Sequence, residues 1–92
     1  MLEKHAVIAT DEAARFARML CKHFAHKVKA DWDEQRGWVE FAMGRCDMQA
    51  REKDLQVRCQ AANQSELEEV ADTIKSHFDR FTQPQGLVLE WR

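Results

Sequence analysis

The sequence predicts an α+β fold in which two helices pack on one face of a mostly antiparallel sheet. Two observations support this prediction. Apolar residues recur at three- and four-residue spacing in two segments, which is typical of amphipathic helices. In the segments before, between and after them, apolar and polar residues alternate, which is typical of half-buried antiparallel strands. The expected order of elements is β-α-β-β-β-β-α-β.

A first strand is expected in the apolar run HAVIAT, residues 5–10, and a helix should follow over residues 11–27. Thr10 is a favourable N-cap, and the acids Asp11 and Glu12 suit the first turn of a helix. The apolar stripe of this helix consists of Ala13, Phe16, Ala17, Leu20 and Phe24.

Four strands are expected next. They cover residues 28–33, 39–43, 46–51 and 55–61. The turns DEQRG and EKD and the single residue Gly44 separate them, and such short connections predict a meander. Alternation directs Cys46 and Cys59 to the inner face of the sheet, where we expect buried and unreactive thiols.

The motif SELE, residues 65–68, matches a capping box and predicts a second helix over residues 65–81. Its apolar stripe consists of Leu67, Val70, Ala71, Ile74, Phe78 and Phe81. QPQG should end this helix, and the alternation in residues 87–92 predicts a last strand. The segments FARMLCKHF and VADTIKSHF align without gaps, which would fit either a structural repeat or two amphipathic helices of similar length.

Length and composition limit the classes of protein. The 92 residues predict one domain, residues 1–92. A net charge of −2 gives no electrostatic reason to expect a nucleic acid or an anionic membrane as partner. No stretch approaches the roughly 20 apolar residues of a membrane span, so a cytoplasmic location is expected. Three cysteines, an odd number, favour reduced thiols over a disulfide framework.

The segment LCKHFAHK, residues 20–27, is the candidate ligand-binding site, with Lys22, His23, His26 and Lys27 as its residues. At i, i+3 on a helix the two histidines are neighbours. One interpretation is a packed helix end, because histidines there complement the helix dipole and bond free carbonyls.

The other interpretation is a metal site made of His23 and His26, with His77 as a further ligand if the two helices lie side by side. The nearby lysines disfavour a cation and favour a small anion or an anionic metal chelate. Cys21 falls about 160° from His23 around the helix, so it should not join the site. We expect Cys21 to be the most reactive of the three thiols, because it lies on a helix flank.

The outer faces of the two helices differ in charge. The first presents Arg15, Arg18 and Lys22, and the second presents Glu66, Glu68, Glu69, Asp72 and Asp79. This asymmetry predicts at most a weak homodimer whose affinity falls as salt rises.

Four stretches, LCKHFAHK, GWVEFAMGRCDMQA, SHFDRF and LVLEW, together resemble the bacterial family of domains of unknown function numbered 2218. The resemblance covers essentially the whole chain and implies a small bacterial protein of unassigned activity. Similar domains occur attached to siderophore-interacting flavin reductases, which implies a functional link to iron uptake for some relatives. The resemblance supplies no catalytic residues and no cofactor.

The sequence therefore favours a small binding or accessory module with its site at the C-terminal end of the first helix. The alternative is a metal- or iron/siderophore-linked protein that uses His23 and His26. A cysteine-dependent enzyme is the third interpretation, since sequence spacing does not show whether a thiol and a histidine meet in space. The chain has no glycine-rich phosphate loop, no GxSxG motif and no tyrosine, so we expect it not to be an enzyme by itself.

Overall fold

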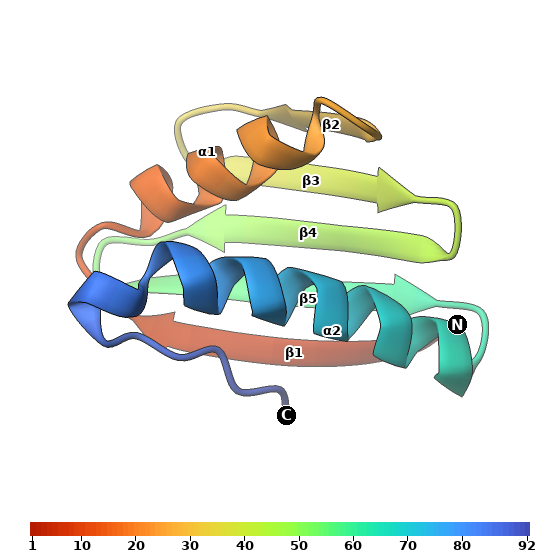
Figure 1. Cartoon of the computed structure of the whole chain (residues 1–92). Helices are drawn as coiled ribbons and strands as arrows, with labels where there is room; N and C mark the ends of the chain where they lie inside the picture. The colour runs from red at the N-terminus through yellow and green to blue at the C-terminus, as the bar shows by residue number, and fades with distance from the viewer.

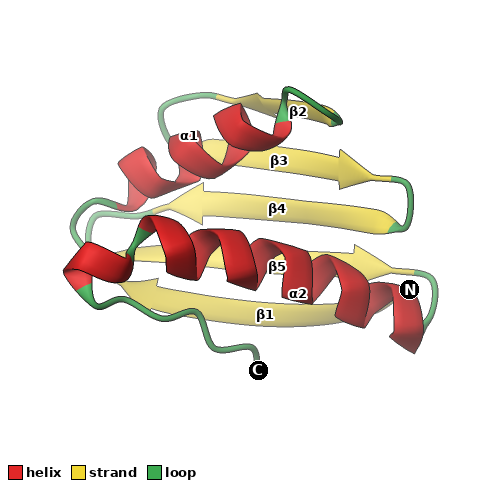
Figure 2. Ribbon diagram, in the orientation of Figure 1, coloured by secondary structure: helices red, strands yellow, loops and turns green.

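The computed structural model describes all 92 residues as a five-stranded antiparallel sheet with two helices on one of its faces (Figures 1 and 2). The elements are β1 (Leu2–Ala9), α1 (Ala13–Phe24), β2 (Lys29–Trp32), β3 (Arg36–Phe41), β4 (Gly44–Ala50), β5 (Asp54–Ala61), α2 (Gln64–Phe81) and the short 3₁₀ helix η1 (Gln83–Gln85). The strand order is β1-β5-β4-β3-β2, so β2 to β5 form the expected meander. The α+β class is confirmed.

One core lies between the sheet and the helices and contains twenty buried residues. The rings of Phe16 in α1 and Phe78 in α2 pack edge to face, with centroids 6.0 Å apart. Cys46 in β4 and Cys59 in β5 are direct cross-strand partners on the inner face, and both are buried, as the alternation predicts. Neither helix has the length and apolar composition of a membrane span.

The expectation that Cys21 is the most reactive thiol is not supported, because its side chain is 0% exposed. Its Sγ atom lies 3.9 Å from the Trp38 carbonyl oxygen, at the surface of β3. Gly37, the residue before Trp38 in β3, allows this close approach, since a Cβ atom there would meet the Cys21 Sγ atom at 2.6 Å. The helix flank is therefore covered by the sheet rather than by water.

The boundaries of α1 differ from those expected. The helix begins at Ala13, after Glu12, while the Thr10 hydroxyl accepts a hydrogen bond from the Glu12 N–H at 3.0 Å. It ends at Phe24, whose carbonyl accepts hydrogen bonds from the N–H groups of both Lys27 and Val28. These two bonds close a tight turn, so residues 25–27 lie outside the helix.

The second helix begins one residue earlier than SELE predicts, and Asn63 is its cap. The Asn63 side-chain oxygen accepts the Glu66 N–H at 2.9 Å, and its amide donates to the Glu66 carboxylate at 2.9 Å. This reciprocal pair performs the role of a capping box with an asparagine in place of the serine.

The last strand is absent, and this part of the prediction is wrong. Residues 87–92 form no regular element, and their only backbone hydrogen bonds to β1 join Arg92 and His5. Side chains of α2 form hydrogen bonds with the backbone of Leu89 instead. Lys75 donates to the Leu89 carbonyl at 2.6 Å, and Asp79 accepts from the Leu89 N–H at 2.9 Å. Leu89 is nevertheless fully buried, which explains the apolar alternation in this segment.

Candidate functional site

His23 at the end of α1 and His77 in α2 lie side by side, with ring centroids 4.8 Å apart and ring planes tilted by 44°. The Phe24 ring packs edge to face against both imidazoles, with centroids 5.2 Å from His23 and 4.8 Å from His77, and the Phe81 ring packs against His23 at 5.4 Å. We refer to these four residues as the histidine cluster. The sequence made the approach of His77 to His23 conditional on the two helices lying side by side, and in the structure the two rings are in contact. Both histidines belong to the HF pairs that match in the aligned segments.

The hydrogen bonding of His77 determines which of its ring nitrogens is available. Its Nδ1 atom lies 2.7 Å from the Thr73 carbonyl oxygen. A carbonyl can only accept, so Nδ1 carries the proton and donates it. In the neutral ring the Nε2 atom then holds a free lone pair, and in the protonated ring it offers a second donor.

The surroundings of the cluster are positively charged. The pKa of the His23 imidazole is lowered, first by loss of hydration and then by the charges of His77, Lys27, His26 and Arg80. Neither Lys27 nor Arg80 forms an ion pair with a carboxylate. The cluster thus combines two imidazoles with positive charge that no acid neutralises.

The remaining candidate residues lie around this cluster without entering it. Lys22 is exposed on α1, and His26 and Lys27 are exposed in the turn that follows Phe24. His26 is outside the helix, so the i, i+3 arrangement of the two histidines on one helix is not formed. The partner of His23 is His77. No three His, Cys, Asp or Glu side chains converge in a geometry suited to a metal ion.

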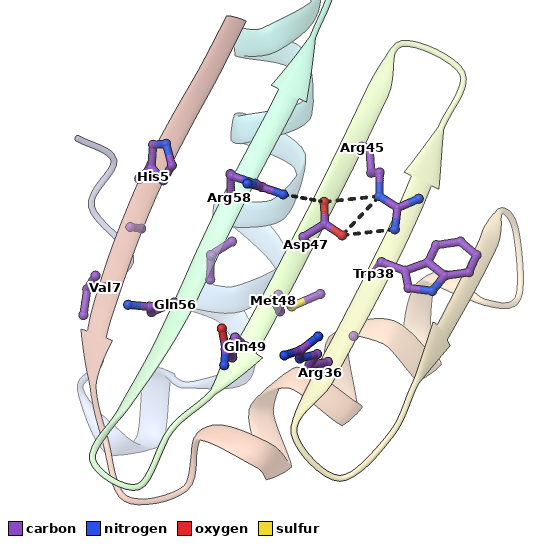
Figure 3. A pocket seen from close by; sticks show the side chains of 13 residues that line it. His5, Val7, Arg36, Trp38, Arg45, Asp47, Met48, Gln49, Gln56 and Arg58 are labelled. Atoms are coloured by element: carbon purple, nitrogen blue, oxygen red, sulfur yellow. Dashed lines mark hydrogen bonds and ion pairs between the residues drawn. The ribbon is translucent and has the colours of Figure 1, made fainter. Parts of the chain in front are cut away.

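The structure also shows a hollow of about 620 Å³ on the sheet face that no helix covers. In Figure 3 the helices lie behind the sheet, and Trp38, Arg45, Asp47 and Arg58 project from the face that is turned away from them. The polar and aromatic side chains that line it are His5, Arg36, Trp38, Arg45, Asp47, Gln49, Gln56 and Arg58. We refer to it as the sheet-face hollow.

Asp47 connects two arginines of the sheet-face hollow, Arg45 and Arg58, by hydrogen bonds and an ion pair. Asp47 accepts hydrogen bonds from Arg45 at 3.1 and 3.2 Å and lies 3.8 Å from Arg58 (Figure 3). The carboxylate of Asp47 raises the pKa of Arg45 above its ordinary value. The Arg45 guanidinium lies over the Trp38 ring, 4.8 Å from its centroid. Arg36 forms no side-chain hydrogen bond or ion pair.

This hollow is not among the sites expected from the sequence. A signal was available, because Arg36 and Trp38 alternate with the buried residues Gly37 and Val39 and so share the outer face of one strand. The register then places Trp38 opposite Asp47, and Asp47 opposite Arg58. That register follows from the pairing of three strands, which alternation within one strand does not specify.

The fold is shared with a solved structure. The NMR structure of PA4090 from Pseudomonas aeruginosa superposes with a TM-score of 0.82, covering 100% of this chain and 96% of that chain at 23% sequence identity. A search of the curated proteins finds no match. Residues 5–92 match the family described as uncharacterized protein conserved in bacteria, DUF2218. With that match over nearly all of its length, this chain belongs to the DUF2218 family.

Proposed function

We propose that the protein is a cytoplasmic binding module, without catalysis of its own, that binds a small anion at the histidine cluster. The observation on which this rests is the contact of His23 with His77 at 4.8 Å in positively charged surroundings. Three free cysteines agree with a reducing compartment.

The charges around the cluster favour an anion over a cation. Lys27 and Arg80 both act on His23 electrostatically, and each would repel a metal ion that bound there. An anion would gain from both charges and from the protonated imidazoles. His26, which is exposed in the turn after α1, adds to the same positive field.

Binding should depend on pH with a definite sign. In the free protein, loss of hydration and then the neighbouring positive charges hold the pKa of His23 below its ordinary value. A bound anion compensates those charges and raises this pKa, so anion binding takes up a proton. By linkage, the affinity for an anion should increase as pH falls through about 6.5.

The test is an NMR titration of the two imidazoles with inorganic phosphate at about pH 5.5 and about pH 7.5. We expect shifts of the His23 and His77 ring signals, with at least a threefold lower dissociation constant at the lower pH, about 0.6 kcal/mol. His23→Gln and His77→Gln should each weaken binding. Lys53→Gln is the control, because it removes an exposed positive charge in the turn between β4 and β5, outside both the histidine cluster and the sheet-face hollow.

The alternative is a metal- or iron/siderophore-linked function at the same residues. Two adjacent imidazoles favour it, because neutral histidine is a common metal ligand. A link to siderophore-interacting reductases would then suit an anionic iron chelate as ligand. Zinc, ferrous iron and a ferric siderophore are therefore further arms of the titration. Binding of zinc or ferrous iron that weakens as pH falls would favour the metal site and overturn the anion site.

A cysteine-dependent enzyme is not favoured by the geometry. All three thiols are buried, and burial raises the pKa of Cys21 to about 11. The pKa of Cys46 is raised as well, first by its hydrogen bond with Cys59 and then by burial. Thiols held in this way are poor nucleophiles near neutral pH.

A further inference from the structure

We infer that the sheet-face hollow is a second binding site, for a small flat organic anion: an aromatic or conjugated ring that carries a carboxylate or phosphate group. The hollow is on the opposite side of the sheet from the histidine cluster, and its residues come from β1, β3, β4 and β5. The inference is therefore independent of the proposed function.

The charge of the hollow points to an anion. Its lining contains three arginines, Arg36, Arg45 and Arg58, and one acid, Asp47. With His5 neutral, these side chains sum to +3 − 1 = +2, whereas the whole chain has a net charge of −2. Positive charge is thus concentrated in this hollow on a chain that is acidic overall.

Trp38 supplies a flat surface that is already in position. Its ring is half-buried on β3, and the Arg45 guanidinium packs over it at 4.8 Å. The Arg45 Nε–H donates to both carboxylate oxygens of Asp47, which fixes the guanidinium, so neither Arg45 nor the indole needs to be ordered when a ligand binds. Planar ligands stack on such a surface, and each stacked ring adds to affinity.

Arg36 supplies the group that would recognise the anion. It lies two residues before Trp38 on the same face of β3 and opposite Gln49 of β4, and its side chain is exposed and unpaired. Figure 3 shows it apart from the Arg45, Asp47 and Arg58 group. A free guanidinium presents a planar fork of donors that matches a carboxylate or phosphate group.

The size of the hollow favours a small molecule. Its volume of about 620 Å³ lies within the range of about 300–1,000 Å³ that is typical of small-molecule sites. A nucleic acid strand would need several exposed aromatic rings along a continuous basic groove. The hollow offers one such ring, Trp38, with Asp47 beside it.

The test compares naphthoate with its neutral amide, naphthamide, in NMR titrations of the intact protein. We expect naphthoate to shift the Trp38 indole N–H and the Arg36 side-chain signals, and to bind at least fivefold more tightly than naphthamide. Phosphate alone should bind here more weakly than naphthoate. The Trp38 indole N–H reports binding in the sheet-face hollow, and the ring signals of His23 and His77 report separately any binding of naphthoate at the histidine cluster.

Two arginine variants distinguish a specific site in the hollow from non-specific attraction between naphthoate and any exposed arginine. Arg36→Gln should weaken naphthoate binding about tenfold, while Arg18→Gln, an exposed and unpaired arginine on α1, should leave it unchanged. Trp38→Leu should reduce it further. Equal affinity for naphthoate and naphthamide, or equal loss in the two arginine variants, would overturn the inference. An oligonucleotide that binds the hollow more tightly than naphthoate would also overturn it.

Discussion

At the scale of single residues, burial decides which functional groups are available. The three thiols are the strongest nucleophiles in the chain by type, yet each is in the core. The imidazoles of His23 and His77 and the guanidinium of Arg36 are less reactive, but they remain in contact with solvent. Binding chemistry at the surface is therefore better supported than covalent chemistry.

We predict that all three cysteines react slowly with a thiol reagent in the native protein. Burial raises the pKa of Cys21 to about 11, which leaves roughly a thousandth of it as thiolate at about pH 8. Labelling rates with a chromogenic disulfide, measured by absorbance and located by mass spectrometry, test this. The rate should rise by at least two orders of magnitude in denaturant. Rapid native labelling of Cys21 would contradict its placement against β3.

At the scale of elements, close contacts of glycine residues set how the layers pack. Gly37 brings β3 to Cys21 of α1, as described above. Gly44, the first residue of β4, follows the two-residue turn of the β3–β4 hairpin. A Cβ atom there would collide with the backbone carbonyl oxygen of Gln60 and would meet Val70 of α2 at 2.8 Å.

We predict that Gly44→Ala destabilises the fold by about 1–3 kcal/mol, because a backbone carbonyl cannot move aside without disturbing the β4–β5 ladder. Urea unfolding followed by circular dichroism measures the change. Val7→Ile is the matched control, since it adds one carbon on the open face of the sheet, where Val7 is exposed. A loss below about 0.5 kcal/mol in Gly44→Ala would show that β5 and α2 adjust to the added methyl group.

At the scale of the whole molecule, the sheet separates two surfaces of different chemistry. The helices cover one face and hold the histidine cluster, while the other face is open and holds the sheet-face hollow (Figures 1 and 3). The weak, salt-sensitive self-association expected from the helix charges stays a prediction. Folding stability, a property of the whole chain, should also reflect the histidine cluster.

We predict that the free energy of unfolding falls as pH drops below about 6.5. The folded state holds the pKa of His23 below its ordinary value, so the unfolded state binds this proton more readily. The contribution of His23 to the free energy of unfolding is therefore complete above the pKa of His23 in the unfolded state, and it is lost as pH falls toward the lower pKa of His23 in the folded state. Urea unfolding at several pH values should show this slope, and His23→Gln should reduce it. An unchanged slope in that variant would assign the effect to other groups.

Local patterns were enough for most of the fold. Spacing of Phe16, Leu20 and Phe24 predicts α1, and alternation around Cys46 and Cys59 predicts both the strands and the burial of these thiols. The predictions of the start of α2 and of the last strand were wrong, because other side chains make the hydrogen bonds that the pattern had assigned to a serine cap and to a strand ladder. Asn63 caps α2 in place of a serine, and the side chains of Lys75 and Asp79 hold Leu89 in place of a strand ladder.

The sequence by itself determined the two helices, the five strands of the sheet, the apolar stripe of each helix and the family, but not the course of residues 87–92 or the burial of Cys21. Only the tertiary structure decided that His23 meets His77, that Gly37 lets the sheet cover Cys21, and that Arg36 and Trp38 share a hollow with Asp47. The physical reason is that periodicity reports how a residue is oriented relative to its own helix or strand. Contacts between elements depend on strand register and on how closely the layers pack, and neither is encoded in the spacing of residues along one segment.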